Sequence, residues 1–152
     1  MIVLKTSREL SIMKEAGRIS AAALKLAGEA VEPGVTTAEI DRLAEKYIRS
    51  QGAVPNFKGY GGFPATACIS INSEVIHGIP SHKRVIRAGD IVSIDLGAAF
   101  EGYNGDNAAT FAAGDVSDEA NALMDATRES LYEGIRMAKA GNRIGDISAA
   151  VQ

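Results

Sequence analysis

Two aspartates stand out by their spacing within a stretch of otherwise apolar and small residues. The segment SIDLGAAFEGYNGDNAATF, residues 93–111, places Asp95 and Asp106 eleven positions apart. If the segment is a β-hairpin connected through residues 99–102, Gly102 supplies the positive φ that such a loop often needs. Asp95 and Asp106 are then expected to face each other directly across the strands, with Cβ atoms roughly 4.5–5.5 Å apart.

Such a pair needs an explanation, because like charges placed opposite each other destabilise a hairpin. A shared proton, a neighbouring Arg or Lys, or a divalent cation held by both carboxylates could offset the repulsion. The alternative is two solvent-facing carboxylates that a one-residue slip in register moves apart. Two carboxylates also make an incomplete metal site, since about two to four further ligands are needed.

Two helices are expected before the hairpin. A capping box that begins at Thr6 starts the first, which ends at Pro33-Gly34, and a second box that begins at Thr36 starts the next, which ends at Gly52. Strands are expected near 65–71, at 91–97 and at 103–112. A third helix is expected over 117–140, with an inward face formed by Leu123, Leu131, Ile135 and Ala138.

A short internal repeat indicates a duplicated unit. The joint between the first two helices, AVEPGVTTAEIDRLAEKY, resembles MAKAGNRIGDISAAVQ after the third helix, at a constant offset of 107 residues. We therefore expect a first repeat over about 1–116, and a second repeat that begins near 117 and is truncated. This predicts that the 152 residues are the N-terminal portion of a longer protein.

Composition is that of one globular domain, with 46% apolar and 23% charged residues. The net charge of −3 and the dispersed basic residues argue against nucleic acid as the main partner. Cys68 is the single cysteine, and the N-terminus lacks the apolar run of a signal peptide, so we expect a reducing, cytoplasmic location. The sequence has no run of about 20 apolar residues, so no membrane partner is expected.

The motifs CISINSEVIHGIP, residues 68–80, and GDIVSIDLGAAFEGYNGDNAATF, residues 89–111, resemble the signature region of type I methionine aminopeptidases. The resemblance covers essentially the whole chain. It implies an α/β pita-bread fold, in which two related halves surround a curved antiparallel sheet. It also implies metal-dependent removal of the initiator methionine from nascent proteins.

The resemblance assigns roles to individual residues. In the family two aspartates, a histidine and two glutamates hold two divalent metal ions, and Asp95 and Asp106 map to the aspartates. The other three ligands fall outside this chain, and Co, Mn, Fe and Zn are not distinguished. His77 maps to a catalytic histidine that contacts the substrate near the scissile amide; a buried histidine satisfied by backbone is the alternative.

Substrate specificity is expected from a pocket for the methionine side chain, lined by Tyr60, Phe63 and Cys68, with ordinary core as the alternative. The chain departs from several relatives at Gly61 and Asn104, where histidine is common, and at Ile76, where cysteine is frequent. Gly61 puts a second substrate-binding histidine in doubt.

The expected function is hydrolysis of Met–Xaa bonds with small Xaa, with the 152 residues alone inactive because three of five metal ligands are missing. The alternatives are a non-catalytic pita-bread binding protein, or another peptidase of this fold such as a proline-specific aminopeptidase. Expected partners are peptides and nascent chains with N-terminal Met, and the ribosome. An unpaired sheet edge suggests a homodimer of the fragment.

Overall fold

The computed structural model describes residues 3–152, which form two compact units divided between Asp115 and Val116. The division lies next to the predicted start of the second repeat, and the duplication itself stays a prediction. Unit 1 contains, in chain order, helices α1 (Ser7–Glu29) and α2 (Thr37–Ser50), strand β1 (Val54–Pro55), the 3₁₀ turn η1 (Tyr60–Gly62), and strands β2 (Ala67–Ile71), β3 (Ile91–Phe100) and β4 (Tyr103–Ala112). Unit 2 contains helices α3 (Asp118–Met137) and α4 (Ile144–Val151).

Both predicted capping boxes are confirmed. At each N-cap the threonine hydroxyl accepts a hydrogen bond from the backbone N–H of the glutamate three residues later, and the glutamate carboxylate accepts one from the threonine backbone. The pairs are Thr6 with Glu9 and Thr36 with Glu39. These local contacts fix where α1 and α2 begin.

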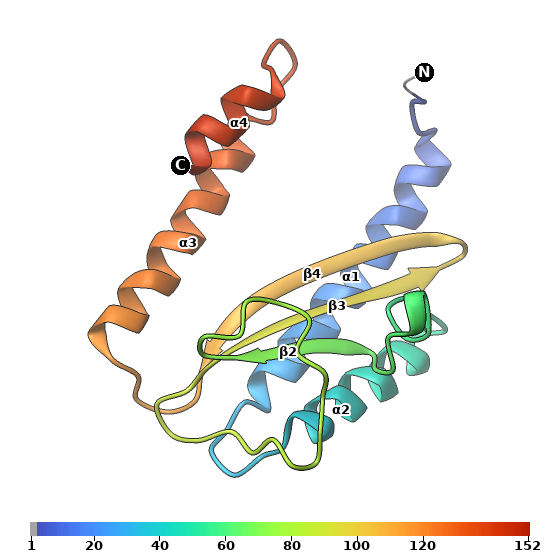
Figure 1. Ribbon diagram of the computed structural model, residues 1–152. Coiled ribbons are helices and arrows are strands. Elements are labelled where there is room, and N and C mark those ends of the chain that lie inside the picture. Colours follow the sequence, from blue (N-terminus) through green and yellow to red (C-terminus); the bar gives the residue numbers. More distant parts are fainter. Residues whose placement is uncertain (1–2) are drawn as a thin grey trace. The chain divides into compact units, whose positions relative to one another are not determined.

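The sheet of unit 1 is antiparallel and centred on β3. Strand β4 pairs with one edge of β3, while β1 and β2 share its other edge. Helices α1 and α2 cover one face of the sheet (Figure 1). The core lies between helices and sheet and is built from small and branched side chains, including Ile19, Ala23, Ile40, Ile48, Ile69, Val92, Ile94 and Leu96.

The β3–β4 hairpin is tighter than the predicted one. Glu101 and Gly102 form a two-residue turn with φ values of 47° and 83°, and positive φ at both positions is what a type I′ turn requires. Asp106 therefore pairs with Gly97, and Asp95 with Ala108. The predicted direct pairing of Asp95 with Asp106 is wrong by two residues, because the connection contains two residues and not four.

Unit 2 differs from the prediction in its packing. Helix α3 ends at Met137, and three of its predicted inward residues, Leu123, Leu131 and Ile135, are 56–60% exposed. Ala138, at the C-cap, is also exposed. Within unit 2 only the short helix α4 packs against α3, so most of the apolar face of the 20-residue helix has no partner there.

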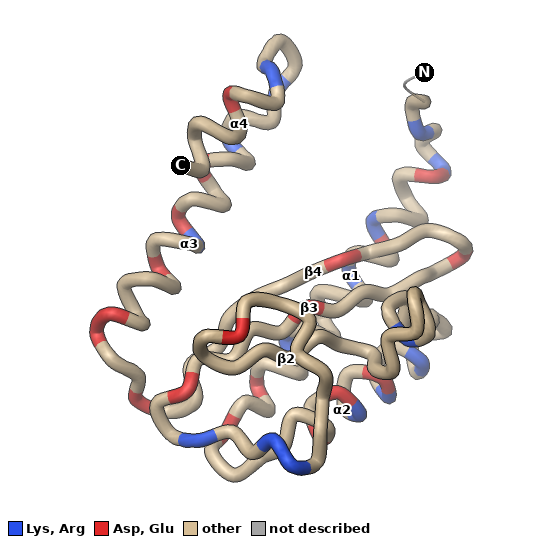
Figure 2. The backbone as a smooth tube through the Cα atoms, in the orientation of Figure 1, with Lys and Arg blue, Asp and Glu red and all other residues tan. Residues whose placement is uncertain are grey.

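Along the backbone, Lys and Arg are interspersed with Asp and Glu on the helices of each unit (Figure 2). Within residues 3–152, each helix is too short or too polar to span a lipid bilayer.

Candidate metal and substrate site

The face of the sheet opposite α1 and α2 is polar. Because Cys68 pairs with Asp95, Ser70 with Ser93, and Gly97 with Asp106, these residues project on the same side. The Ser93 and Thr110 hydroxyls are 2.8 Å apart on this face, which shows the small polar side chains meeting across β3 and β4.

Asp95 and Asp106 are diagonal neighbours on the polar face. A shift of two residues in register keeps a side chain on its original face, so the error in the predicted pairing does not separate the two carboxylates. Diagonal cross-strand neighbours are about 7–8 Å apart, within reach of each other's charge. Burial raises the pKa of the Asp95 carboxyl, the negative charge of Asp106 raises it further, and His77 lowers it.

Strand β4 is held close to α1 just before Asp106. A Cβ atom on Gly105 would lie 2.3 Å from the carbonyl carbon and oxygen of Ala16, so only glycine permits this approach. One strand position later than Asp106, the Asn107 side-chain amide donates a 2.6 Å hydrogen bond to the Ser20 hydroxyl. Contacts on both sides of Asp106 therefore fix its backbone against the helix, while its side chain is exposed on the opposite face.

His77 lies in the connection between β2 and β3 and is exposed, so the alternative of a buried histidine is wrong. Its φ is 62°, a left-handed conformation that is uncommon outside glycine. The segment is anchored next to it: the Ile69 N–H donates a 2.8 Å hydrogen bond to the Gly78 carbonyl, and the Gly78 N–H donates one of 3.1 Å to the Ser70 hydroxyl. The Ser70 hydroxyl that accepts from Gly78 belongs to the polar face, and His77 lowers the pKa of Asp95.

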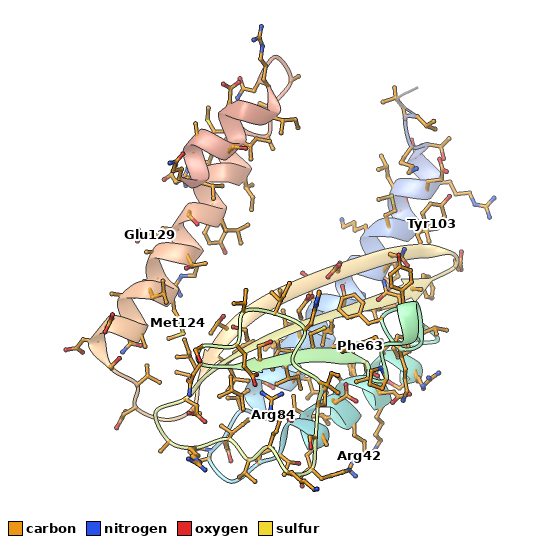
Figure 3. The ribbon with its side chains drawn as sticks, viewed as in Figure 1. Arg42, Phe63, Arg84, Tyr103, Met124 and Glu129 are labelled. Atoms are coloured by element: carbon orange, nitrogen blue, oxygen red, sulfur yellow. The ribbon has the colours of Figure 1, made fainter. Side chains whose placement is uncertain are left out.

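The three expected pocket residues differ in exposure. Cys68 is 5% exposed and faces Asp95, and burial followed by the charge of Asp95 raises the pKa of its thiol to about 11, so it is a neutral, apolar surface. Tyr60 is 83% exposed and Phe63 is half-buried. Both belong to the turn around η1, where the Phe63 N–H donates to the Tyr60 carbonyl; Figure 3 labels Phe63. A methionine pocket formed by all three stays a prediction.

The donor set is part of a metal site. Asp95 and Asp106 supply oxygen ligands of the kind that divalent cations bind. A cation bound by both carboxylates would offset the repulsion between them. Within residues 3–152, however, no group of three or more His, Cys, Asp or Glu side chains is arranged to hold a metal ion. The residues present fit a metal, with further ligands needed from elsewhere.

Known proteins share both the sequence and the fold. A profile of metallopeptidase family M24 matches residues 11–152. The chain belongs to family M24. It is 52% identical to a methionine aminopeptidase of Clostridium acetobutylicum over all 152 residues, which is 61% of that relative. The resemblance to methionine aminopeptidases is confirmed by this identity, and the family is one of metal-dependent peptidases.

Solved M24-type structures confirm the pita-bread fold. A Thermotoga maritima methionine aminopeptidase superposes with a TM-score of 0.97 at 39% identity, covering the whole chain and 61% of that structure. A Pyrococcus furiosus prolidase superposes with a TM-score of 0.85 at 25% identity, covering 98% of the chain and 42% of that structure. The chain thus spans less than two thirds of each of these M24 relatives.

Reading the sequence missed the residues that hold the His77 segment of this M24 chain. Ser70 could have been found, since it alternates with Ile69 and Ile71 in β2 and so shares the face of Cys68. Arg84 carried no such signal, because its contacts join residues up to 15 positions away that only the fold brings together.

Proposed function

We propose that the chain provides Asp95, Asp106 and His77 to a methionine aminopeptidase that removes the initiator methionine from nascent proteins when the second residue is small. The observation that best supports this is the pair of carboxylates on one polar face of the sheet, and His77 lowers the pKa of Asp95. Identity of 52% with a methionine aminopeptidase supports methionine as the substrate residue.

The proposed roles follow from the chemistry of each side chain. Asp95 and Asp106 would hold two divalent ions jointly with ligands outside this chain. When bound, such ions would supply a water of lowered pKa and polarisation of the scissile carbonyl. His77, exposed on its loop, would donate a hydrogen bond to the substrate near the scissile amide and steady the charge that develops there.

Specificity is proposed to come from the methionine pocket. The neutral Cys68 thiol would form its floor beside Asp95, and Tyr60 and Phe63 would form its walls. Soft and aromatic side chains suit a thioether, since sulfur makes favourable contacts with ring edges. Such a pocket would place the methionine side chain next to the carboxylates, with the first peptide bond near the residues that would hold the metal.

The experiment that tests the proposal joins residues 1–152 to the remainder of the Clostridium acetobutylicum relative that the chain does not cover. With Mn²⁺ or Co²⁺ added, the chimera is expected to release methionine from Met-Ala-Ser, and its Asp95→Ala variant is expected to be inactive. The 152-residue chain alone is expected to be inactive with either metal, because two ligands cannot hold the ions in place. Release of methionine by the isolated chain would overturn that part.

Two other outcomes would replace the proposal. Cleavage of Xaa-Pro peptides in preference to Met-Ala-Ser would assign the chain to the proline-specific peptidases, which share the fold at lower identity. A folded chimera that binds metal but cleaves neither substrate would favour a binding protein. We further propose a cytoplasmic location with access to nascent chains at the ribosome, supported by the single cysteine.

A further inference from the structure

The His77 loop, residues 72–80, is not held in place by hydrophobic packing. Its apolar side chains point into solvent: Val75 is 86% exposed, Ile76 65% and Ile79 53%. His77 itself has a φ of 62°, a left-handed conformation that is uncommon among L-residues. The loop must therefore be held by polar contacts, and these determine where the imidazole lies.

One set of contacts attaches the loop directly to β2. The Ile69 N–H donates to the Gly78 carbonyl at 2.8 Å, and the Gly78 N–H donates to the Ser70 hydroxyl at 3.1 Å. A Cβ atom on Gly78 would lie 2.1 Å from the Ile69 carbonyl oxygen, so only glycine fits where the loop contacts the strand. Gly78, the residue directly after His77, is thus held to β2 through both its N–H and its carbonyl.

Arg84 connects the remaining parts of the loop. Its Nη1 donates to the Ile69 carbonyl and to the Ile79 carbonyl, each at 3.2 Å, which ties the end of the loop to the strand edge. Its Nη2 forms an ion pair with Glu74, whose carboxylate also accepts a 2.9 Å hydrogen bond from the Ile71 N–H. Figure 3 shows Arg84 beside β2.

These contacts lie on both sides of His77. Glu74 precedes it by three residues and Ile79 follows it by two, so one guanidinium fixes both arms of the loop against β2. Guanidinium presents several donors in a fixed plane, which allows one side chain to serve two carbonyls and a carboxylate together. The Arg84 side chain is 25% exposed, so water competes only partly for these donors.

We propose that Arg84, assisted by Ser70, is a positioning residue that holds His77 in its left-handed conformation and so sets where the imidazole meets the substrate. The proposal rests on the proposed function for the role of His77 in the reaction. The positioning itself concerns only the 152-residue chain and can be measured without activity.

The primary test is amide hydrogen exchange by NMR on the 152-residue chain, comparing wild type with Arg84→Gln, Arg84→Lys and Lys83→Gln. In Arg84→Gln, exchange of the Ile69 and Gly78 amides is expected to accelerate on the order of tenfold, as for loss of a charge-assisted hydrogen bond. The His77 Cα and Cβ shifts should lose their left-handed signature. Arg84→Lys should fall between, and the exposed neighbour Lys83 should have no effect.

The amides that pair β3 with β4 provide the internal control and should keep their wild-type rates. If Arg84→Gln fails to fold, Ser70→Ala removes the acceptor of the Gly78 amide and takes its place in the comparison. Unchanged exchange at Ile69 and Gly78 in a folded Arg84→Gln chain, with unchanged His77 shifts, would overturn the proposal.

The link to catalysis is tested in the chimera. Arg84→Gln is expected to lower kcat at least about tenfold with KM changed less than about twofold, and to have little further effect in a His77→Ala background, because both changes remove the same interaction. Additive losses would mean that Arg84 acts on some other group. An inactive chimera would contradict the proposed function and leave the exchange result to decide the positioning.

Discussion

The repulsion between Asp95 and Asp106 leads to a quantitative prediction for the metal-free chain. The two carboxylates are diagonal neighbours on β3 and β4, one half-buried and one exposed. Two unit charges about 7 Å apart repel by roughly 1 kcal/mol at an effective dielectric constant of about 40, between the surface and bulk-water values. Either Asp95→Asn or Asp106→Asn should therefore stabilise the chain when no metal is bound.

A double-mutant cycle isolates this term. Unfolding by urea in the presence of EDTA is measured for wild type, both single variants and the double variant, at low salt and pH 7. Since either substitution alone abolishes the pair, the double variant should gain about 1 kcal/mol less than the sum of the single gains. Raising the salt to about 1 M shortens the Debye length to roughly 3 Å and should remove most of the coupling.

Strict additivity at low salt would refute the reasoning, because it would mean that the carboxylates do not sense each other across the strands. Loss of stability in both single variants would also refute it, and would indicate that each carboxylate has a favourable partner. A matched control is Asp115→Asn at the end of unit 1, which removes an exposed carboxylate away from the pair and should change stability by less than about 0.5 kcal/mol.

Three further predictions concern the framework. Gly105→Ala should destabilise the chain by about 1–3 kcal/mol, seen as a lower thermal midpoint, because its Cβ would lie 2.3 Å from the Ala16 carbonyl; Gly17→Ala in α1, where nothing lies within 4 Å, should not. Hydrogen bonds from the Thr6 backbone and hydroxyl, and then from Tyr103, lower the pKa of Glu9 to about 2. The stability that Glu9 contributes as a capping residue is therefore complete above the usual pKa of 4.5 and is lost as the pH falls towards 2. An NMR titration midpoint near 4.5 for Glu9 would contradict this. Strand β4 pairs only with β3 among the described residues, so the chain should dimerise at high concentration, and a monomer mass by light scattering throughout would refute that.

Local structure, including the starts of α1 and α2, was predictable from the sequence. The N-termini of α1 and α2 follow from contacts within four residues of chain, so Thr6 and Thr36 identify them without any knowledge of the fold. Strand β4 was likewise predicted at its observed bounds, Tyr103–Ala112, and Gly102 marks the turn directly before it. The polar face was also predictable, since alternation along β3 places Asp95 opposite the core residues Ile94 and Leu96.

Register and tertiary contacts were not predictable in the same way. The two-residue turn depends on Glu101 adopting a φ of 47°, whereas the usual sequence signal for a type I′ turn is Asn or Asp before Gly. The prediction of a buried face on α3 is wrong, because Leu123, Leu131, Ile135 and Ala138 are all exposed and only the short helix α4 packs against α3 within unit 2. Arg84 reads as one of several basic residues in a polar connection until the fold brings Ile69 and Ile79 to it.

The error in the predicted register does not change which face of the sheet carries Asp95 and Asp106. Side chains in a strand alternate with a period of two, so a two-residue error changes which residues are paired but not which face they occupy. A one-residue error would have placed Asp106 among the core residues beneath α1. Since burying an unpaired carboxylate there is far more costly than exposing it, the hydrophobic pattern excludes the odd shifts and leaves only the even ones.

The charge pair therefore presents a conflict that folding alone does not resolve. Asparagine at either position would keep the hydrogen-bonding capacity and volume of the side chain while removing the repulsion. Selection for stability alone would not favour two carboxylates on a face of small residues. Partial burial and the charge of Asp106 both oppose ionisation of Asp95. A positive group bound between them would turn their repulsion into attraction, and His77 already lowers the pKa of Asp95. The same two substitutions that stabilise the metal-free chain should therefore weaken metal binding in the chimera, and a variant that improves both would contradict this account.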